Sequence, residues 1–323
     1  MDQYRAPPWL IGGHLQTILP VLARKLRAAA NPPLQRARWT TPDGADFIDV
    51  DWQGTDLDAP LIVLFHGLEG SSSSPYAQAI ARWAQAHRWR YAVPHFRGCS
   101  GEINLAPRSY HSGDHQEVGW ILERFRTLHR GRIAAVGFSL GGNALLRWAG
   151  EAGGQAARSV RSVAAVSAPV DLVAGGTALG TGLINTNVYT RMFMHTLKPK
   201  ALAKLAQHPG LFDRRRLLAA RTLYDFDDVY TGPVHGYAGA TDYWTRASAK
   251  PHLAEIRIPA LLLNARNDPF FPAGNLPRPG QAAPNVRLWQ PADGGHVGFP
   301  GRTWPFETDP VPDAVMGWIG RHL

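Results

Sequence analysis

Residues 137–141 read Gly-Phe-Ser-Leu-Gly and could present Ser139 as a nucleophile. They follow the apolar, β-prone run 132–136 and precede the helix-forming run 143–149. A serine at such a strand-to-helix reversal sits in a strained backbone conformation, and the glycines on each side leave room for neighbouring chain. The amide of Leu140 then stands at a helix start, where free N–H groups favour an anion. An ordinary turn with a capping serine is the alternative, but the flanking elements favour a nucleophile.

A serine hydroxyl needs a base that takes its proton and an acid that orients the base. Among the thirteen histidines, His296 lies in a glycine-containing loop after the last predicted strand, which suits a base aimed at Ser139. Asp268 directly follows another predicted strand and precedes a proline that fixes the next φ. Asp293 is the nearest competitor, although it could instead hold its own loop. We predict Asp268 as the acid.

The negative oxygen formed on the substrate during acyl transfer needs hydrogen-bond donors that are already in place. The turn His66-Gly67-Leu68 directly follows a predicted strand, so the Leu68 amide can face the same site as the Leu140 amide. We therefore predict an oxyanion hole made by these two N–H groups. Losing one such donor typically costs about 3 kcal/mol of transition-state stabilisation.

Predicted strands alternate with predicted helices after an initial hairpin, which indicates an α/β fold with a mostly parallel, eight-stranded sheet. We divide the chain into an N-terminal extension (1–35), a core (36–170 and 260–323) and an insertion (171–259). The insertion has helical stretches but no clear strand, so we expect it to cover the site as a mainly helical cap. The predicted strands are 36–41, 45–52, 61–65, 90–96, 133–138, 160–167, 260–264 and 286–289.

The composition is that of a globular protein with a sizeable core, since 45% of the 323 residues are hydrophobic and 18% are charged. The formal net charge is +9, but the basic residues are scattered and only 214–216 form a tight run, which disfavours a nucleic-acid partner. Cys99 is the only cysteine, so an intrachain disulfide is impossible.

The N-terminal apolar segment 9–23 has its basic residues after it rather than before it, which is the wrong polarity for a signal peptide. It is also too short to span a bilayer, so we expect a soluble cytoplasmic protein. Residues 15–26 could form a basic amphipathic helix, giving peripheral contact with the inner membrane face through residues 1–30. Packing of this helix on its own domain is the favoured alternative.

No motif calls for a cofactor or a metal. His111 and His115 lie four residues apart but have no further ligand nearby in sequence, so we interpret this junction as a helix cap. Residues 180–182 lack the third glycine of a dinucleotide-binding turn. The acidic run 225–228 could bind a cation, but we expect it to anchor the cap through Arg221 and helix ends.

The chain resembles the α/β-hydrolase superfamily over residues 36–323. It is similar, more narrowly, to the bacterial YheT-like hydrolases, relatives of the eukaryotic ABHD1/ABHD3 group. The order nucleophile, acid, base along the chain fits this superfamily and differs from the orders in chymotrypsin-like and subtilisin-like proteases. The matching motifs are Gly-Gly-His-Leu-Gln-Thr (12–17), Phe-Arg-Gly-Cys-Ser-Gly-Glu (96–102), Tyr-His-Ser-Gly (110–113), Tyr-Asp-Phe-Asp-Asp (224–228) and Asp-Tyr-Trp (242–244).

The resemblance implies that Ser139, Asp268 and His296 are the charge-relay positions of a serine hydrolase that cleaves carboxylic esters through an acyl-enzyme. An aromatic, leucine-rich cap predicts an ester or lipid with an apolar acyl or alcohol group. An acyltransferase or thioesterase with the same triad is the first alternative. A membrane-associated or binding protein with an idle site is the second. A carboxylate nucleophile is disfavoured because the turn carries serine.

Overall fold

An eight-stranded sheet forms the centre of the protein. The computed structural model describes residues 4–26, 31–302 and 310–323. The strands follow one another in the order expected from the sequence, each within a few residues of its predicted bounds. They are β1 (Gln35–Thr40), β2 (Phe47–Gln53), β3 (Leu61–Phe65), β4 (Arg90–Pro94), β5 (Ile133–Phe138), β6 (Ser162–Val166), β7 (Ala260–Leu263) and β8 (Val286–Trp289).

The strand order is β1-β2-β4-β3-β5-β6-β7-β8. The first two strands pair antiparallel with each other, and β2 pairs antiparallel with β4. All pairs from β3 to β8 are parallel. The central strands are buried along their whole length, as continuous apolar runs in a parallel sheet should be. The predicted α/β fold with a mostly parallel sheet is therefore confirmed.

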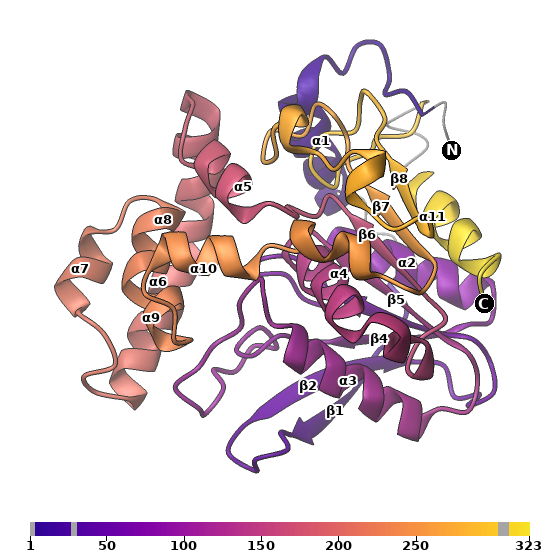
Figure 1. Cartoon of the computed structure of the whole chain (residues 1–323), viewed down its shortest axis with the longest axis horizontal. Coiled ribbons are helices and arrows are strands. Elements are labelled where there is room, and N and C mark those ends of the chain that lie inside the picture. Colours follow the sequence, from indigo (N-terminus) through magenta and orange to yellow (C-terminus); the bar gives the residue numbers. More distant parts are fainter. Residues whose placement is uncertain (1–3, 27–30, 303–309) are drawn as a thin grey trace.

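Helices cover both faces of the sheet (Figure 1). On one face, α3 (His115–Leu128) and α4 (Leu140–Ala152) bury apolar side chains such as Leu122 and Leu145 against the strands. On the other face, α2 (Pro75–Ala86) and α11 (Pro310–Gly320) bury Ile80 and Val315. The result is a three-layer core that holds the carboxyl ends of β3, β5, β6, β7 and β8 along one edge.

Residues 171–259, which we call the cap, are inserted between β6 and β7 and contain no strand. They project to one side of the sheet (Figure 1) and have an apolar cluster of their own that includes Leu217, Phe226 and Trp244. The helices of the cap are α5 (Leu172–Leu179), η2 (Asn185–Thr190), α6 (Arg191–Gln207), α7 (Arg214–Ala219), α8 (Leu223–Phe226), η3 (Asp227–Thr231), α9 (Gly232–Val234), α10 (Ala240–Ala247) and η4 (Lys250–Glu255).

The acidic run 225–228 ties the cap's own helices together. Asp225 accepts the backbone N–H of Arg221 at the start of α8. Asp228 forms an ion pair of 3.0 Å with Arg216 on α7. Asp227 accepts the indole N–H of Trp244 at 2.7 Å, and burial raises the pKa of Asp227 to about 6. Each carboxylate thus has a partner within the cap.

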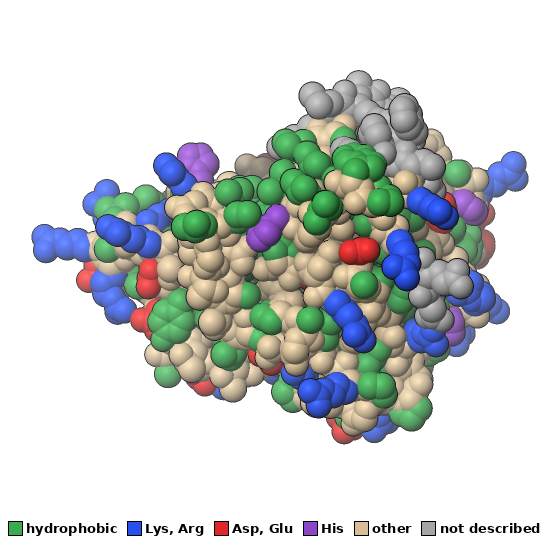
Figure 2. Space-filling view, turned by 90° about the horizontal axis from the view of Figure 1, so that it is seen from above, with side chains coloured by type: hydrophobic (Ala, Val, Ile, Leu, Met, Phe, Trp, Pro, Cys, Tyr) green, Lys and Arg blue, Asp and Glu red, His purple; other side chains and the backbone are tan. Residues whose placement is uncertain are grey.

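Helix α1 (Gly12–Leu26) lies at the edge of the molecule beside the segments that follow β7 and β8. One side of it is buried and the other exposes apolar side chains, on a face of the molecule seen in Figure 2. No helix among the described residues is long and apolar enough to cross a membrane. The remaining short helices are η1 (Gly153–Arg158), η5 (Ala273–Asn275) and η6 (Pro279–Gln281).

Candidate active site

Ser139 occupies the sharp turn between β5 and α4. Its φ is 51°, in the left-handed region that residues with a side chain rarely adopt. Two glycines are required here because the chain approaches itself closely. A Cβ at Gly137 would lie 2.5 Å from the carbonyl oxygen of Gly141, and one at Gly141 would lie 2.4 Å from that of His66. The turn therefore lifts the Ser139 hydroxyl above the end of β5.

The structure brings the predicted nucleophile, base and acid into hydrogen-bonding succession. The Ser139 hydroxyl lies 3.0 Å from Nε2 of His296, and Nδ1 of His296 lies 2.9 Å from Oδ2 of Asp268. With its Nδ1 proton donated to Asp268, the imidazole is left with Nε2 as the acceptor for the serine proton. The geometry suits proton transfer from serine to histidine.

Asp268 is itself held in position. Its side chain is fully buried, and Oδ1 accepts the backbone N–H of Phe270 at 2.8 Å. The Phe270 ring stacks on the His296 imidazole with 4.1 Å between ring centres. Asp293, the competing acid, instead accepts from the side chain of Asn267 at 3.4 Å and does not contact the imidazole.

The turn that carries Leu68 is fixed by His66. Burial lowers the pKa of His66 to about 3, so the ring is neutral at physiological pH. It donates from Nδ1 to the Gly67 carbonyl and accepts the Phe96 amide on Nε2. This fixes both the tautomer and the ring orientation.

The amides on either side of Leu68 are each bonded to a tyrosine hydroxyl. The Gly67 N–H donates to Tyr76 at 2.8 Å, and the Glu69 N–H donates to Tyr110 at 2.9 Å. Tyr110 in turn donates to the Glu69 carboxylate. Leu68 therefore sits between two anchored peptide units and lines the same cavity as Leu140. The two residues predicted to form the oxyanion hole and Ser139 therefore border one cavity.

A cavity opens beside Ser139 and His296 between the cap and the core. Two of its charged groups are neutralised within the protein, because Lys200 of α6 pairs with Glu69 at 2.9 Å. Most of the remaining lining is apolar, and the cap supplies the larger part of these apolar side chains. The apolar lining residues include Leu68, Leu140, Leu172, Leu179, Phe193, Leu197, Leu223, Phe226, Tyr230, Trp244 and Phe270.

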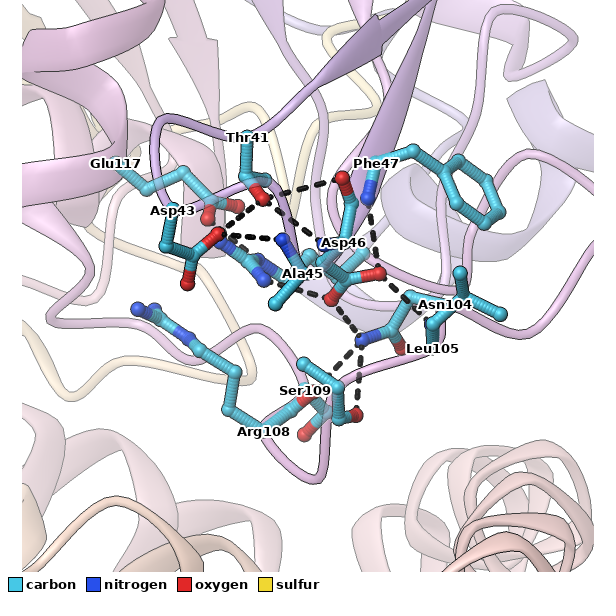
Figure 3. A network of polar contacts seen from close by, with 12 residues as sticks. Thr41, Asp43, Ala45, Asp46, Phe47, Asn104, Leu105, Arg108, Ser109 and Glu117 are labelled. Carbon is cyan, nitrogen blue, oxygen red and sulfur yellow. Dashed lines mark hydrogen bonds and ion pairs between the residues drawn. The ribbon is translucent and has the colours of Figure 1, made fainter.

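The wall of this cavity formed by residues 97–110 is held by a buried polar network around Asp46, in the turn between β1 and β2 (Figure 3). The Asp46 carboxylate accepts from Arg97 and from the side chain of Asn104, each at 2.6 Å. Burial opposes the charge of Asp46, but these hydrogen bonds prevail and lower its pKa. Arg97 also pairs with Glu117 at 2.6 Å, so it has two carboxylate partners.

From the cap side, Lys204 of α6 reaches the same wall. Its ammonium group donates to the carbonyls of Asn104 and Ala106, and burial lowers its pKa to about 8. The cap and the core loop therefore meet through a buried cation as well as through apolar contacts.

Helix α1 holds the two loops that carry the predicted acid and base. Gln16 accepts at its side-chain oxygen from Asn267 and from the Gly294 amide, both at 2.8 Å. The Thr17 hydroxyl accepts the backbone N–H of His296 at 2.8 Å. The sequence analysis noted the motif at 12–17 without giving these residues a role. Gln16 and Thr17, polar residues within a largely apolar stretch that also contains His14, were the available signal.

His111, which is buried, and His235, which is half-buried, lie against each other between the core and the cap, with 4.5 Å between ring centres. His115 lies apart from this pair and bonds to the Gly113 carbonyl. Among the residues that the structure describes, no group of three or more His, Cys, Asp or Glu side chains is arranged to hold a metal ion.

Comparison with known proteins places this chain among hydrolases. A family model described as "alpha/beta hydrolase fold" matches residues 60–302. The Escherichia coli protein "Putative esterase YheT" is 40% identical over 96% of this chain and 91% of its own length. Human "Phospholipase ABHD3" is 28% identical over 94% of this chain and 75% of its own length. The resemblance to the YheT-like group and to ABHD3 is thereby confirmed.

Solved structures support the same fold at low sequence identity. The Pyrococcus furiosus esterase Pf2001 matches with a TM-score of 0.55 and 16% identity over 90% of this chain and 93% of that one. The Butyrivibrio proteoclasticus protein Est1E matches with a TM-score of 0.58 and 13% identity, over 88% of this chain and 99% of that one. Together with the family match and the sheet topology, these findings show that the chain belongs to the alpha/beta hydrolase fold family.

Proposed function

We propose that the protein is a serine esterase that cleaves carboxylic esters through an acyl-enzyme, with Ser139 as nucleophile, His296 as base and Asp268 as acid. The observation that carries this proposal is the succession of two hydrogen bonds, 3.0 Å and 2.9 Å long, that joins the three side chains. The position of Ser139 at a strand-to-helix turn beside an apolar cavity supports the same reaction.

In the first half of the reaction, Nε2 of His296 takes the hydroxyl proton as Ser139 Oγ bonds to the ester carbonyl carbon. The carbonyl oxygen becomes an oxyanion, which the N–H groups of Leu68 and Leu140 stabilise. Asp268 stabilises the imidazolium. His296 then gives its proton to the leaving alcohol as the bond between carbonyl carbon and alkoxy oxygen breaks.

In the second half, His296 takes a proton from water and the resulting hydroxide adds to the acyl carbon. Collapse of this second tetrahedral species breaks the bond to Ser139 Oγ, which regains its proton from the imidazolium. The acid leaves and the enzyme is restored. The apolar lining of the cavity favours an ester with a hydrophobic acyl or alcohol group.

The test is hydrolysis of p-nitrophenyl esters of increasing chain length by the wild type and by Ser139→Ala. We expect the variant to lose at least about a thousandfold in kcat, because removal of a nucleophile eliminates the covalent route. Ser73→Ala, at an exposed position of the serine run 71–74, makes the same chemical change and should retain wild-type turnover.

A fluorophosphonate probe provides a second readout, since it should label the wild type and Ser73→Ala but not Ser139→Ala. Wild-type turnover by Ser139→Ala would remove Ser139 from the mechanism. Adding alcohols or acyl-CoA esters to the same assay distinguishes hydrolysis from acyl transfer and thioester cleavage.

A further inference from the structure

Large exposed apolar side chains are concentrated in two short segments of the chain. Nine of the fifteen in the described part of the protein fall within residues 9–22 or 183–192, which together hold 24 residues. Scattered single exposures would need no explanation, but such a concentration does. The nine are Trp9, Ile11, Leu15, Val21 and Leu22 of the first segment and Leu183, Ile184, Val188 and Met192 of the second.

These two segments lie side by side although about 170 residues separate them in sequence. His14 of α1 contacts Tyr189 of η2, with 3.3 Å between Nδ1 and the hydroxyl oxygen. Both segments also contact the loop after β7, since Asn185 donates to the Pro269 carbonyl and Gly13 packs against Asn267. Figure 2 views this face and shows hydrophobic side chains gathered across it. We call the nine side chains the apolar face.

The apolar face borders the candidate active site. Tyr189 packs edge-on against Phe270, with 4.6 Å between ring centres, and Phe270 stacks on His296. Phe193, one residue beyond Met192, lines the cavity. Only the side chains of Tyr189 and Phe270 therefore separate a molecule bound on the apolar face from the His296 imidazole.

The charged residues in and directly after the two segments are all basic. The first segment has no charged residue, but Arg24, Lys25 and Arg27 follow it closely. Arg191 lies within the second segment and Lys198 follows it, whereas Lys200 is already paired with Glu69. Residues 9–27 and 183–200 contain no acidic residue. The whole chain carries a net charge of +9. An anionic surface complements this pattern, whereas a second copy of the same face would present like charges to it.

The exposed apolar side chains of the first segment are not the ones that hold this segment on the protein. Leu10, Gln16 and Thr17 are buried and fix the helix on the protein, whereas Ile11 is 77% exposed. Leu183, at the start of the second segment, is 84% exposed. Apolar side chains that stay in water in the folded protein contribute little to folding, whereas their burial in a membrane interface favours partitioning.

We propose that the apolar face docks on an anionic phospholipid bilayer, with α1 and η2 lying in the interface. Docking does not require catalysis, so a binding experiment tests it independently of the esterase proposal. It would bring the mouth of the cavity to the lipid surface. Residues 183–192 thus join the N-terminal segment as the contacting surface.

Co-sedimentation with vesicles of phosphatidylcholine, with and without phosphatidylglycerol, tests the proposal. We expect the wild type to bind vesicles that contain phosphatidylglycerol and to be released by high salt. Ile11→Ser combined with Leu183→Ser should lower the partition coefficient at least about tenfold. Leu105→Ser combined with Leu128→Ser removes two exposed leucines outside both segments, and this control should bind as the wild type does.

Hydrolysis of a short, soluble p-nitrophenyl ester reports whether each variant is folded, since neither Ile11 nor Leu183 lines the cavity. Equal binding by wild type and the Ile11/Leu183 variant, or no vesicle binding by the wild type, would overturn the proposal. So would a dimer in gel filtration that the same two substitutions dissociate, because the face would then belong to a second copy.

Discussion

The strained backbone of Ser139 is held by hydrogen bonds to the neighbouring strand and helix. A positive φ at a residue with a side chain costs about 1–3 kcal/mol, so neighbouring contacts must hold it. The Ser139 N–H donates to Val166 of β6 at 2.8 Å, and the Ser139 carbonyl accepts from Gly142 and Asn143 in the first turn of α4. The hydroxyl is therefore aimed by the sheet and the helix together rather than by a flexible loop.

The close approach around this turn leads to a stability prediction for Gly137→Ala. The added Cβ would lie 2.5 Å from the Gly141 carbonyl oxygen and 2.6 Å from the Gly142 Cα, so backbone must shift. We expect the free energy of unfolding to fall by about 1–3 kcal/mol, together with a loss of esterase activity. Urea denaturation at neutral pH measures the first effect.

Gly154→Ala is the matched control, because a Cβ there would meet no atom within 4 Å and the residue has no positive φ. The midpoint of its urea transition should equal that of the wild type. A Gly137→Ala protein as stable and as active as this control would show that the turn tolerates a side chain and is not tightly constrained.

At the scale of elements, α1 acts as a strap across the loops that follow β7 and β8. It approaches so closely that a Cβ at Gly298 would lie 1.8 Å from the Gln16 carbonyl oxygen. Through Gln16 and Thr17 the helix bonds to the segments that carry Asp268 and His296. Removing one of these bonds should disturb the relative placement of acid and base more than the stability of the sheet.

Thr17→Val tests this role with almost no change in side-chain shape. The variant leaves the buried backbone N–H of His296 without its acceptor, a loss that corresponds to about 1–3 kcal/mol. We expect kcat for a soluble ester to fall about tenfold or more while KM changes little, because the base shifts but the cavity does not.

Thr127→Val serves as the control, since its exposed hydroxyl donates to a carbonyl within α3 and Thr127 does not line the cavity. Its kcat should match that of the wild type. If Thr17→Val lowered kcat and raised KM in parallel with a large drop in thermal stability, α1 would be a structural brace rather than a positioning element.

The elements themselves were predictable because their signals are local. The run 61–65 is apolar throughout, as a strand buried on both faces must be, and it became β3. The pairing of Gln16 with Asn267 spans 251 residues and leaves no periodic or capping signal. Sequence therefore predicted Ser139, Asp268 and His296 by type and position, but not the helix that holds two of them.

At the scale of the whole molecule, the cavity is made by the meeting of cap and core. Its lining comes from the loops after the six strands β3 to β8 and from α5, α6, α8, η3 and α10 of the cap. The sequence therefore predicted an apolar character but not the residues that enclose the cavity. His111 of the core lies at this junction with His235 of the cap, which also bonds to the Ser109 carbonyl at 2.9 Å. His111 is buried and His235 is half-buried, and the loss of hydration lowers the pKa of each.

This junction predicts a pH dependence of stability. Burial lowers the pKa of His111 from 6.5 to about 3, although Asp114 acts in the opposite direction. Between these values the unfolded chain binds the proton more readily than the folded protein, so stability is complete above pH 6.5 and is lost as the pH falls toward 3. At pH 5 the loss due to His111 is about 2 kcal/mol. The charged and titratable groups acting on His111 are Asp114, His235, Arg108 and Arg147.

Urea denaturation at pH 8 and pH 5 should isolate this contribution when the wild type is compared with His111→Asn, whose side-chain oxygen can replace Nδ1 as acceptor of the Gly113 amide. Other buried groups also make the free energy of unfolding depend on pH. Burial raises the pKa of Glu117 to about 7, so its contribution to stability grows as the pH falls, opposite to that of His111. The informative quantity is therefore the difference between variants in the stability lost from pH 8 to pH 5, rather than the loss in the wild type alone. His111→Asn should lose about 2 kcal/mol less between the two pH values, whereas His87→Asn, at an exposed position, should follow the wild type. Equal losses in all three proteins would mean that His111 is not held neutral at the junction of cap and core.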